Sequence, residues 1–206
     1  MELLEALNKC PLIAILRGVT PREVVPIGQA LIDNGFTCIE VPLNSPEEPF
    51  SSIAHLLAAF KDNAVIGAGT VTEVAQIQTL AQIGCPLVVM PHTQAGLIHA
   101  CKEEKLSCIP GFSTPSEAFA ALNAGADALK LFPAPAPFIL KAIKSILPEE
   151  VLVLPVGGIN PDSMPHYIHA GANGFGLGAS LYKPGDSPSS VAQKAKEFYV
   201  TIRSLS

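Results

Sequence analysis

The sequence predicts an α/β fold, a single-domain (β/α)₈ TIM barrel, and two observations support this prediction. Eight short apolar runs follow one another along the chain, and a segment of helical length comes after each of them. Such a regular alternation predicts parallel strands joined by right-handed helical crossovers. The 206 residues suffice for one sizeable core and no linker divides them, so we expect one domain over residues 1–206.

Each apolar run is short enough for a strand, and several of the segments between the runs end in the same way. The predicted strands are Leu12–Arg17, Thr37–Leu43, Ala64–Gly69, Pro86–Pro91, Ser107–Gly111, Asp127–Pro133, Leu152–Gly158 and Asn173–Gly178. A glycine suited to a left-handed helix C-cap precedes four of them, at Gly35, Gly84, Gly125 and Gly171. The helix that ends at Gly35 is expected to start at Pro21. A repeat of roughly 20–25 residues favours a small barrel over an open doubly wound sheet.

Composition narrows the classes of function. A net charge of −5 without a basic cluster argues against nucleic acid as a partner. No apolar stretch approaches the ~20 residues that span a bilayer, and the N-terminal residues do not resemble a signal peptide. The five scattered cysteines predict no disulfide framework, so we expect a cytoplasmic protein. With only 15% charged residues, one surface is expected to be buried against other copies of the chain.

Charged residues stand next to or within apolar stretches of three predicted strands, at Arg17, Glu40 and Lys130. Barrel active sites lie at the C-terminal ends of the strands, so these residues are the first candidates. If Lys130 points inward, desolvation favours its neutral amine, a nucleophile that attacks a ketone to form an iminium. If it points outward, it is a lysine whose ammonium group reaches water.

Glu40 and Arg17 each have a functional and a structural interpretation. Next to an iminium, the Glu40 carboxyl group would move protons. The planar fork of Arg17 suits a carboxylate. Alternatively, each forms a structural ion pair, Glu40 with Lys130 or Arg17.

Small residues follow several of the predicted strands. Gly157–Gly158 and Gly176–Gly178 end the last two predicted strands, a place where barrels often bind phosphate through backbone N–H groups. The stretch GAGT, which ends at Thr70, would let a substrate approach the backbone. The alternative is that all of these are ordinary tight turns. The histidines show no zinc-ligand spacing, and we expect neither a metal nor a cofactor.

Six segments together resemble the bacterial 2-keto-3-deoxy-6-phosphogluconate and 6-phosphogalactonate aldolases: IEVPLNSP, IGAGTV, CIPGFSTPSEA, ALKLFPA, PVGGINP and GLGASLY. The resemblance extends over nearly the whole chain. It implies a class I aldolase that releases pyruvate from a phosphorylated sugar acid, works without a metal and forms homotrimers. Lys130 would form the Schiff base, and Glu40 would be the general acid/base. The resemblance also implies substrate-binding residues: Thr70, Pro91 and Phe132 for the pyruvyl group, and Gly157, Gly158, Gly178, Ala179 and Ser180 for the phosphate.

Two positions resemble the galactonate enzymes more than the gluconate enzymes. Asn44 stands where the gluconate enzymes usually have an arginine, so Arg17 would contact the substrate carboxylate. Val156 stands where they usually have a threonine, and valine cannot hydrogen-bond to the C4 hydroxyl group. Ala179 departs from the serine common in the family, which puts a hydroxyl contact to the phosphate in doubt. The gluconate epimer, a barrel isomerase or epimerase and a non-catalytic sugar-phosphate sensor are the alternatives.

Overall fold

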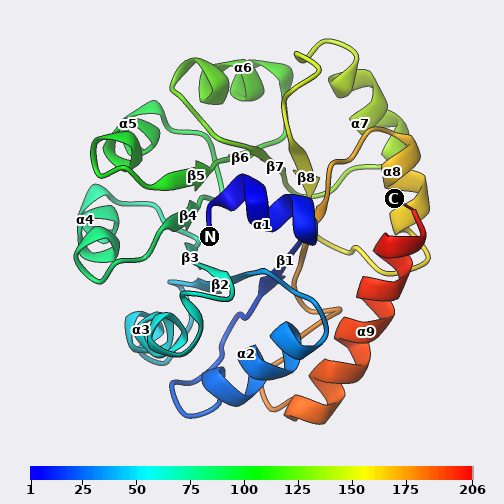
Figure 1. The fold of residues 1–206 in the computed structure, drawn as a ribbon. Helices are drawn as coiled ribbons and strands as arrows, with labels where there is room; N and C mark the ends of the chain where they lie inside the picture. The colour runs from blue at the N-terminus through cyan, green and yellow to red at the C-terminus, as the bar shows by residue number, and fades with distance from the viewer. Residues whose placement is uncertain (206) are drawn as a thin grey trace.

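The computed structural model describes residues 1–205, and all of its paired strands are parallel, with helices packed around them (Figure 1). Residue 206, the last of the predicted domain, lies outside the described residues. The elements follow in the order α1 (Leu3–Lys9), β1 (Leu12–Ile15), α2 (Val24–Asp33), β2 (Cys38–Pro42), α3 (Pro49–Phe60), β3 (Val65–Gly69), α4 (Val74–Gln82), β4 (Leu87–Val89), α5 (Ala95–Glu103), β5 (Ser107–Ile109), β6 (Gly111–Phe112), α6 (Pro115–Asn123), β7 (Leu129–Leu131), α7 (Pro137–Lys144), β8 (Val153–Pro155), α8 (Met164–His169), β9 (Phe175–Leu177) and α9 (Pro188–Ser204).

Every predicted strand contains an observed strand, so the α/β alternation is confirmed. The predicted fifth strand is divided into β5 and β6 by Pro110, which has no N–H group to continue a ladder. The strands form a six-stranded sheet in the order β5-β4-β3-β2-β1-β9 and a three-stranded sheet in the order β6-β7-β8. An isolated parallel bridge between Val156 and Gly176 links the end of β8 to β9.

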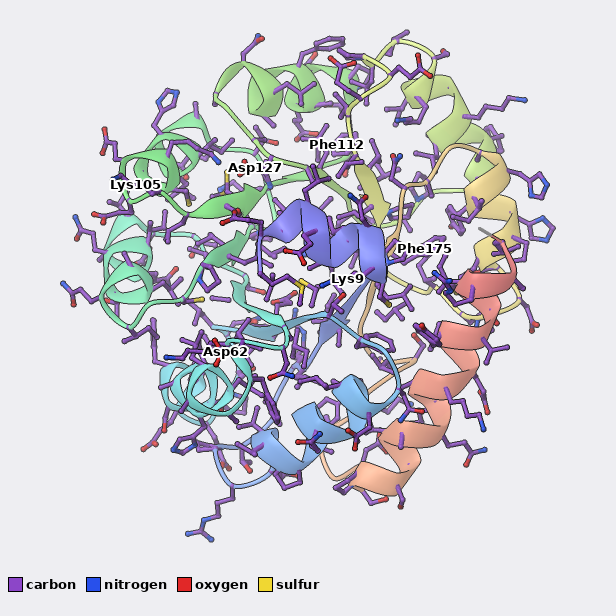
Figure 2. All side chains as sticks on the ribbon, viewed as in Figure 1. Lys9, Asp62, Lys105, Phe112, Asp127 and Phe175 are labelled. Atoms are coloured by element: carbon purple, nitrogen blue, oxygen red, sulfur yellow. The ribbon has the colours of Figure 1, made fainter. Side chains whose placement is uncertain are left out.

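Side chains along each strand alternate between two faces. The outer layer lies on the face covered by the helices, and the inner layer lies on the opposite face. In β2, Ile39 and Val41 belong to the outer layer, whereas Cys38 belongs to the inner one. Phe112 and Phe175 are large members of the outer layer (Figure 2). The inner layer joins six aliphatic residues from five strands: Ile13, Val65, Leu87, Val89, Ile109 and Leu154.

Helix α1 was not predicted, and it covers the N-terminal ends of the strands (Figure 1). Its Leu3, Ala6 and Leu7 are buried in the same cluster as the inner-layer side chains. Their spacing of three and four residues was the available signal, because it places them on one face of a helix. The inner layer is therefore packed with apolar side chains at this end.

The predicted strands are longer than the observed ones, and two of the boundaries that change are the end of the first strand and the start of the helix after it. Strand β1 ends at Ile15, and Gly18, with a φ of +79°, makes a turn, so Arg17 lies in a loop and not in a strand. Helix α2 begins at Val24, because Pro21 lies in a preceding turn. The predicted helix caps are confirmed, since the four glycines that were expected to be left-handed all have positive φ angles.

All five cysteines are free and buried. Within residues 1–205, no helix combines the length and the apolar character that crossing a membrane requires.

Candidate active site

A cavity of about 640 Å³ lies where the chain leaves β1, β2, β3, β4, β7, β8 and β9. It brings together every site residue that was predicted from the sequence: Arg17, Glu40, Thr70, Pro91, Lys130, Phe132, Val156, Gly157, Gly158, Gly178, Ala179 and Ser180. Five further residues line it, namely Ile15, Asn44, Ile159, Asn160 and Gly176. Asn160 directly follows the PVGGI segment, and this position could have predicted it as a cavity residue.

Lys130 occupies the middle of β7, and the strand period decides where its side chain lies. Its neighbours Leu129 and Leu131 pack in the outer layer under the helices. Lys130 therefore points inward, where it lines the cavity and is only 7% exposed. Its Nζ atom lies 4.9 Å from the centre of the Phe132 ring, a distance typical of a cation–π contact. The inward interpretation is confirmed, and the outward one is wrong.

Glu40 reaches the same cavity from β2, where it is flanked by the outer-layer residues Ile39 and Val41. It is 2% exposed, and its Oε2 atom is buried without a hydrogen-bond partner among the described residues. Within residues 1–205 it forms no salt bridge with Lys130 or Arg17. The structural ion pair that was an alternative for Glu40 is therefore not formed.

Aliphatic side chains lie beside Glu40 and Lys130, and the resulting desolvation shifts the pKa values of both groups. Ile13, Ile109 and Leu154 line the same inner void as Glu40 and Lys130. Desolvation raises the pKa of Glu40 to about 7, against the opposing effect of the Lys130 and Arg17 charges. Desolvation also lowers the pKa of Lys130, against the effect of Glu40. A carboxyl group with a pKa near 7 both accepts and donates protons at neutral pH, and the lowered lysine pKa makes neutral amine available.

Arg17 lies at the mouth of the cavity, in the loop after β1. Its two terminal nitrogens donate hydrogen bonds to Oδ1 of Asn44 and, over 3.5 Å, to Oγ1 of Thr70. It forms no salt bridge with a carboxylate of the described residues. The structural ion pair considered for Arg17 is therefore absent as well.

Another part of the cavity wall is built from backbone. Gly157 and Gly158 have φ angles of +108° and +70°, a conformation that disfavours other residues. A Cβ atom on Gly158 or Gly178 would meet no other atom within 4 Å, so the space above both is open. The N–H groups of Gly158, Ala179 and Ser180 donate no hydrogen bond within residues 1–205. Such a concave set of N–H donors suits an anion.

Three further predicted residues line the same cavity as Lys130. Pro91 follows β4, Thr70 follows β3, and Val156 follows β8 with its side chain against Gly176. Over the described part of the chain, no cluster of His, Cys, Asp and Glu side chains is arranged to hold a metal ion. The cavity thus combines a buried amine, a buried carboxyl group with a raised pKa, a guanidinium group at its mouth and backbone N–H groups without partners among the described residues.

Comparisons with known proteins agree with this chemistry. The family model "KDPG and KHG aldolase" matches residues 3–189. The chain is 44% identical over 198 residues to the 2-dehydro-3-deoxy-6-phosphogalactonate aldolase of Escherichia coli, covering 95% of this chain and 96% of the relative. It also resembles the solved structure "Native KDPGal structure", with 44% identity, a TM-score of 0.93 and 96% of each chain covered. A cube-shaped protein cage, designed by fusing symmetric oligomeric domains, is 43% identical with a TM-score of 0.92, covering 94% of this chain and 72% of that one. The chain belongs to the KDPG and KHG aldolase family.

Proposed function

We propose that this protein is a class I aldolase that cleaves 2-dehydro-3-deoxy-6-phosphogalactonate to pyruvate and glyceraldehyde 3-phosphate. The observation that carries the proposal is that Lys130 and Glu40 line one cavity without forming a salt bridge to each other. An ion pair would hold the lysine protonated, whereas a separated, desolvated amine is available as a nucleophile. The 44% identity to a phosphogalactonate aldolase over 95% of the chain supports the choice of substrate.

The reaction follows from these two side chains. The neutral amine of Lys130 adds to the C2 carbonyl to give a carbinolamine, and Glu40 in its acid form donates a proton to the hydroxyl group of this adduct. Water then leaves, which yields an iminium that accepts electrons and a Glu40 carboxylate. The Glu40 carboxylate takes the proton of the C4 hydroxyl group while the C3–C4 bond breaks. The electron pair of that bond then flows to the iminium nitrogen and forms an enamine. Glyceraldehyde 3-phosphate leaves, Glu40 returns a proton to C3, and water hydrolyses the iminium to pyruvate and free Lys130.

The ends of the cavity orient the substrate. The phosphate is expected at the unpaired N–H groups of Gly158, Ala179 and Ser180. The carboxylate is expected at Arg17, and Pro91, Thr70 and Phe132 would enclose the pyruvyl carbons. Because Ser180 follows Ala179 directly, its hydroxyl group is a candidate for the contact that Ala179 lacks.

The substrate has two epimers at C4, and Val156 bears on the choice between them. Its side chain packs against Gly176 and lines the cavity, so it offers an apolar surface and no hydrogen-bond partner. We therefore expect the galactonate epimer to be preferred and the gluconate epimer to be the secondary substrate.

The proposal also covers the closure of the barrel, the location of the protein and its oligomeric state. The two sheets would close into one eight-stranded (β/α)₈ barrel, since β5 and β6 are separated by Pro110 alone and Val156 bridges to Gly176. The chain would form a single domain that contains the whole active site. The protein would work in the cytoplasm. Homotrimer assembly is supported by the low charge of the chain and by the likeness to a cage built from symmetric oligomeric domains.

Reduction by borohydride in the presence of pyruvate tests the mechanism. We expect a reduced pyruvyl adduct on the peptide that contains Lys130, located by peptide mass mapping, and no adduct in Lys130→Ala. Lys144→Ala is the matched control, because burial also lowers the pKa of Lys144 although it lies outside the cavity. Turnover of each epimer by the wild-type protein then measures the preference.

Each result has a distinct meaning. An adduct at Lys130 together with faster turnover of the galactonate epimer supports the whole proposal. An adduct with faster turnover of the gluconate epimer keeps the mechanism and reverses the assigned substrate. A folded protein that forms no adduct with saturating pyruvate would exclude a Schiff-base aldolase and favour an isomerase, an epimerase or a non-catalytic sugar-phosphate sensor.

A further inference from the structure

We infer that Asn44 is a positioning residue, which docks the guanidinium group of Arg17 at the mouth of the cavity without neutralising its charge. This inference rests on the proposed function, because it assigns the docked cation to the carboxylate end of a 2-keto acid. It makes selectivity for a carboxylate depend on the contact between Arg17 and Asn44 rather than on Arg17 alone.

The contacts of Arg17 carry the first step. One terminal nitrogen donates to the amide oxygen of Asn44, and the other lies 3.5 Å from the hydroxyl oxygen of Thr70. All three residues line the cavity. A long side chain at an exposed position loses rotamer freedom when it is ordered, so such contacts hold the fork in place before a ligand arrives.

The chemistry of these acceptors carries the second step. An amide oxygen and a hydroxyl oxygen bear no net charge, and no carboxylate of the described residues forms a salt bridge with Arg17. The guanidinium group is therefore fixed in place while its full positive charge remains. A carboxylate partner would fix it equally well, but it would cancel the charge that attracts an anion.

The loops that meet at Arg17 carry the third step. Arg17, Asn44 and Thr70 follow β1, β2 and β3, which are neighbours in the six-stranded sheet. The N–H group of Gly18 also donates to the hydroxyl oxygen of Ser45 over 2.9 Å, which ties the first two loops together next to the docked side chain. Ser45 does not line the cavity, so it offers a way to loosen the loops without touching Arg17.

Competition between two ketones tests the inference. We would compare the rates of borohydride-dependent inactivation with pyruvate and with hydroxyacetone, a neutral ketone of similar size. The ratio of the two rates measures selectivity for the carboxylate, and Arg17→Ala defines the value without the cation. We expect Asn44→Ala to lower this ratio about tenfold, the effect of losing about 1.4 kcal/mol from one charge-assisted hydrogen bond.

Two variants separate docking from charge and from general loosening. Asn44→Asp keeps an acceptor next to the guanidinium group but neutralises it, so we expect the ratio to fall as in Asn44→Ala. Ser45→Ala breaks the tether between the loops, and we expect the ratio to stay at the wild-type value.

Several results would overturn the inference. A wild-type ratio in Asn44→Ala would show that the contact between Asn44 and Arg17 does not affect selectivity. A wild-type ratio in Asn44→Asp would show that the absence of charge on residue 44 does not affect it. An equal loss of both rates in Asn44→Ala would assign Asn44 a merely structural role. If the wild-type protein reacts with neither ketone, the Schiff-base function itself fails, and that outcome is distinct from the others.

Discussion

A Cβ atom on Gly69 would lie 1.5 Å from Oε2 of Glu40, so the carboxyl group occupies the volume that any other side chain at this position would need. Glu40 pairs in register with Gly67, while Gly69 is the last residue of the same neighbouring strand, β3. The carboxyl group therefore lies over the C-terminal end of β3, where the cavity begins. A glycine at position 69 is a condition for the location of the proposed proton-transfer group.

Gly69→Ala tests this relationship. The backbone of Gly69 is not left-handed, so alanine suits its conformation, and the three atoms nearest to the added Cβ atom all belong to the Glu40 carboxyl group. Displacement of a general acid/base should lower kcat by about 100-fold in a protein that still folds. The control is Gly96→Ala in helix α5, where an added Cβ atom meets nothing within 4 Å. Wild-type kcat in Gly69→Ala would contradict the assignment.

The buried carboxyl group also makes stability depend on pH. The pKa of Glu40 is raised from 4.5 to about 7 in the folded protein and returns to its usual value on unfolding. The unfolded chain releases this proton at lower pH, so the folded state loses stability as pH rises from 4.5 through about 7. Glu40→Gln should therefore unfold with a free energy that exceeds the wild-type value by a margin reaching about 3 kcal/mol above pH 7.

Urea denaturation of both proteins at pH 5 and pH 8 measures that margin. The surface substitution Glu47→Gln is the matched control, and only the buried substitution should show the gain. A margin that is equal at the two pH values would mean that burial does not raise the Glu40 pKa. The substituted protein should at the same time lose most of its kcat, because glutamine cannot transfer the proton.

The proposed phosphate site is tested by a substitution that fills part of it. Gly178 has open space above its Cα atom, and its φ angle is not positive, so Gly178→Ala adds a methyl group without backbone strain. The methyl group would stand next to the free N–H groups of Ala179 and Ser180. We expect the KM for the phosphorylated substrate to rise about tenfold, because one anion contact is lost.

Pyruvate provides the comparison for Gly178→Ala, because it carries no phosphate. Borohydride should still trap its adduct on Lys130 in the variant. If the variant loses the pyruvate adduct as well, the methyl group disturbs the whole cavity. If its KM is unchanged, the phosphate binds elsewhere.

The parts of the site that lie on strands could be predicted from the sequence, because a strand has a fixed period. Lys130 stands between two leucines that pack under the helices, so its inward direction follows once β7 is a strand. The same reasoning holds for Glu40 between Ile39 and Val41. The family resemblance placed the remaining residues at the strand ends, where the structure has them.

The parts that depend on loops could not be predicted in this way. The contact of Arg17 with Asn44 needs the shapes of two loops that are 27 residues apart in the chain. Nor does alternation reveal the close approach of Glu40 to Gly69, which depends on a rotamer. Helix α1 could have been predicted from the sequence, because Leu3, Ala6 and Leu7 repeat at helical spacing.

Val156→Thr tests the choice between the two epimers. The branched side chain of Val156 packs against Gly176 at the cavity wall, and threonine has nearly the same shape with a hydroxyl group in place of one methyl group. That hydroxyl group can hydrogen-bond to a C4 hydroxyl group, which valine cannot do. We expect the ratio of kcat/KM for the galactonate epimer to that for the gluconate epimer to fall about tenfold. Val74→Thr, which makes the same change on the exposed side of α4, should leave the ratio as it is. An unchanged ratio in Val156→Thr would mean that another residue of the cavity discriminates between the epimers. Asn160, a polar residue that also lines the cavity, would then be the next one to substitute.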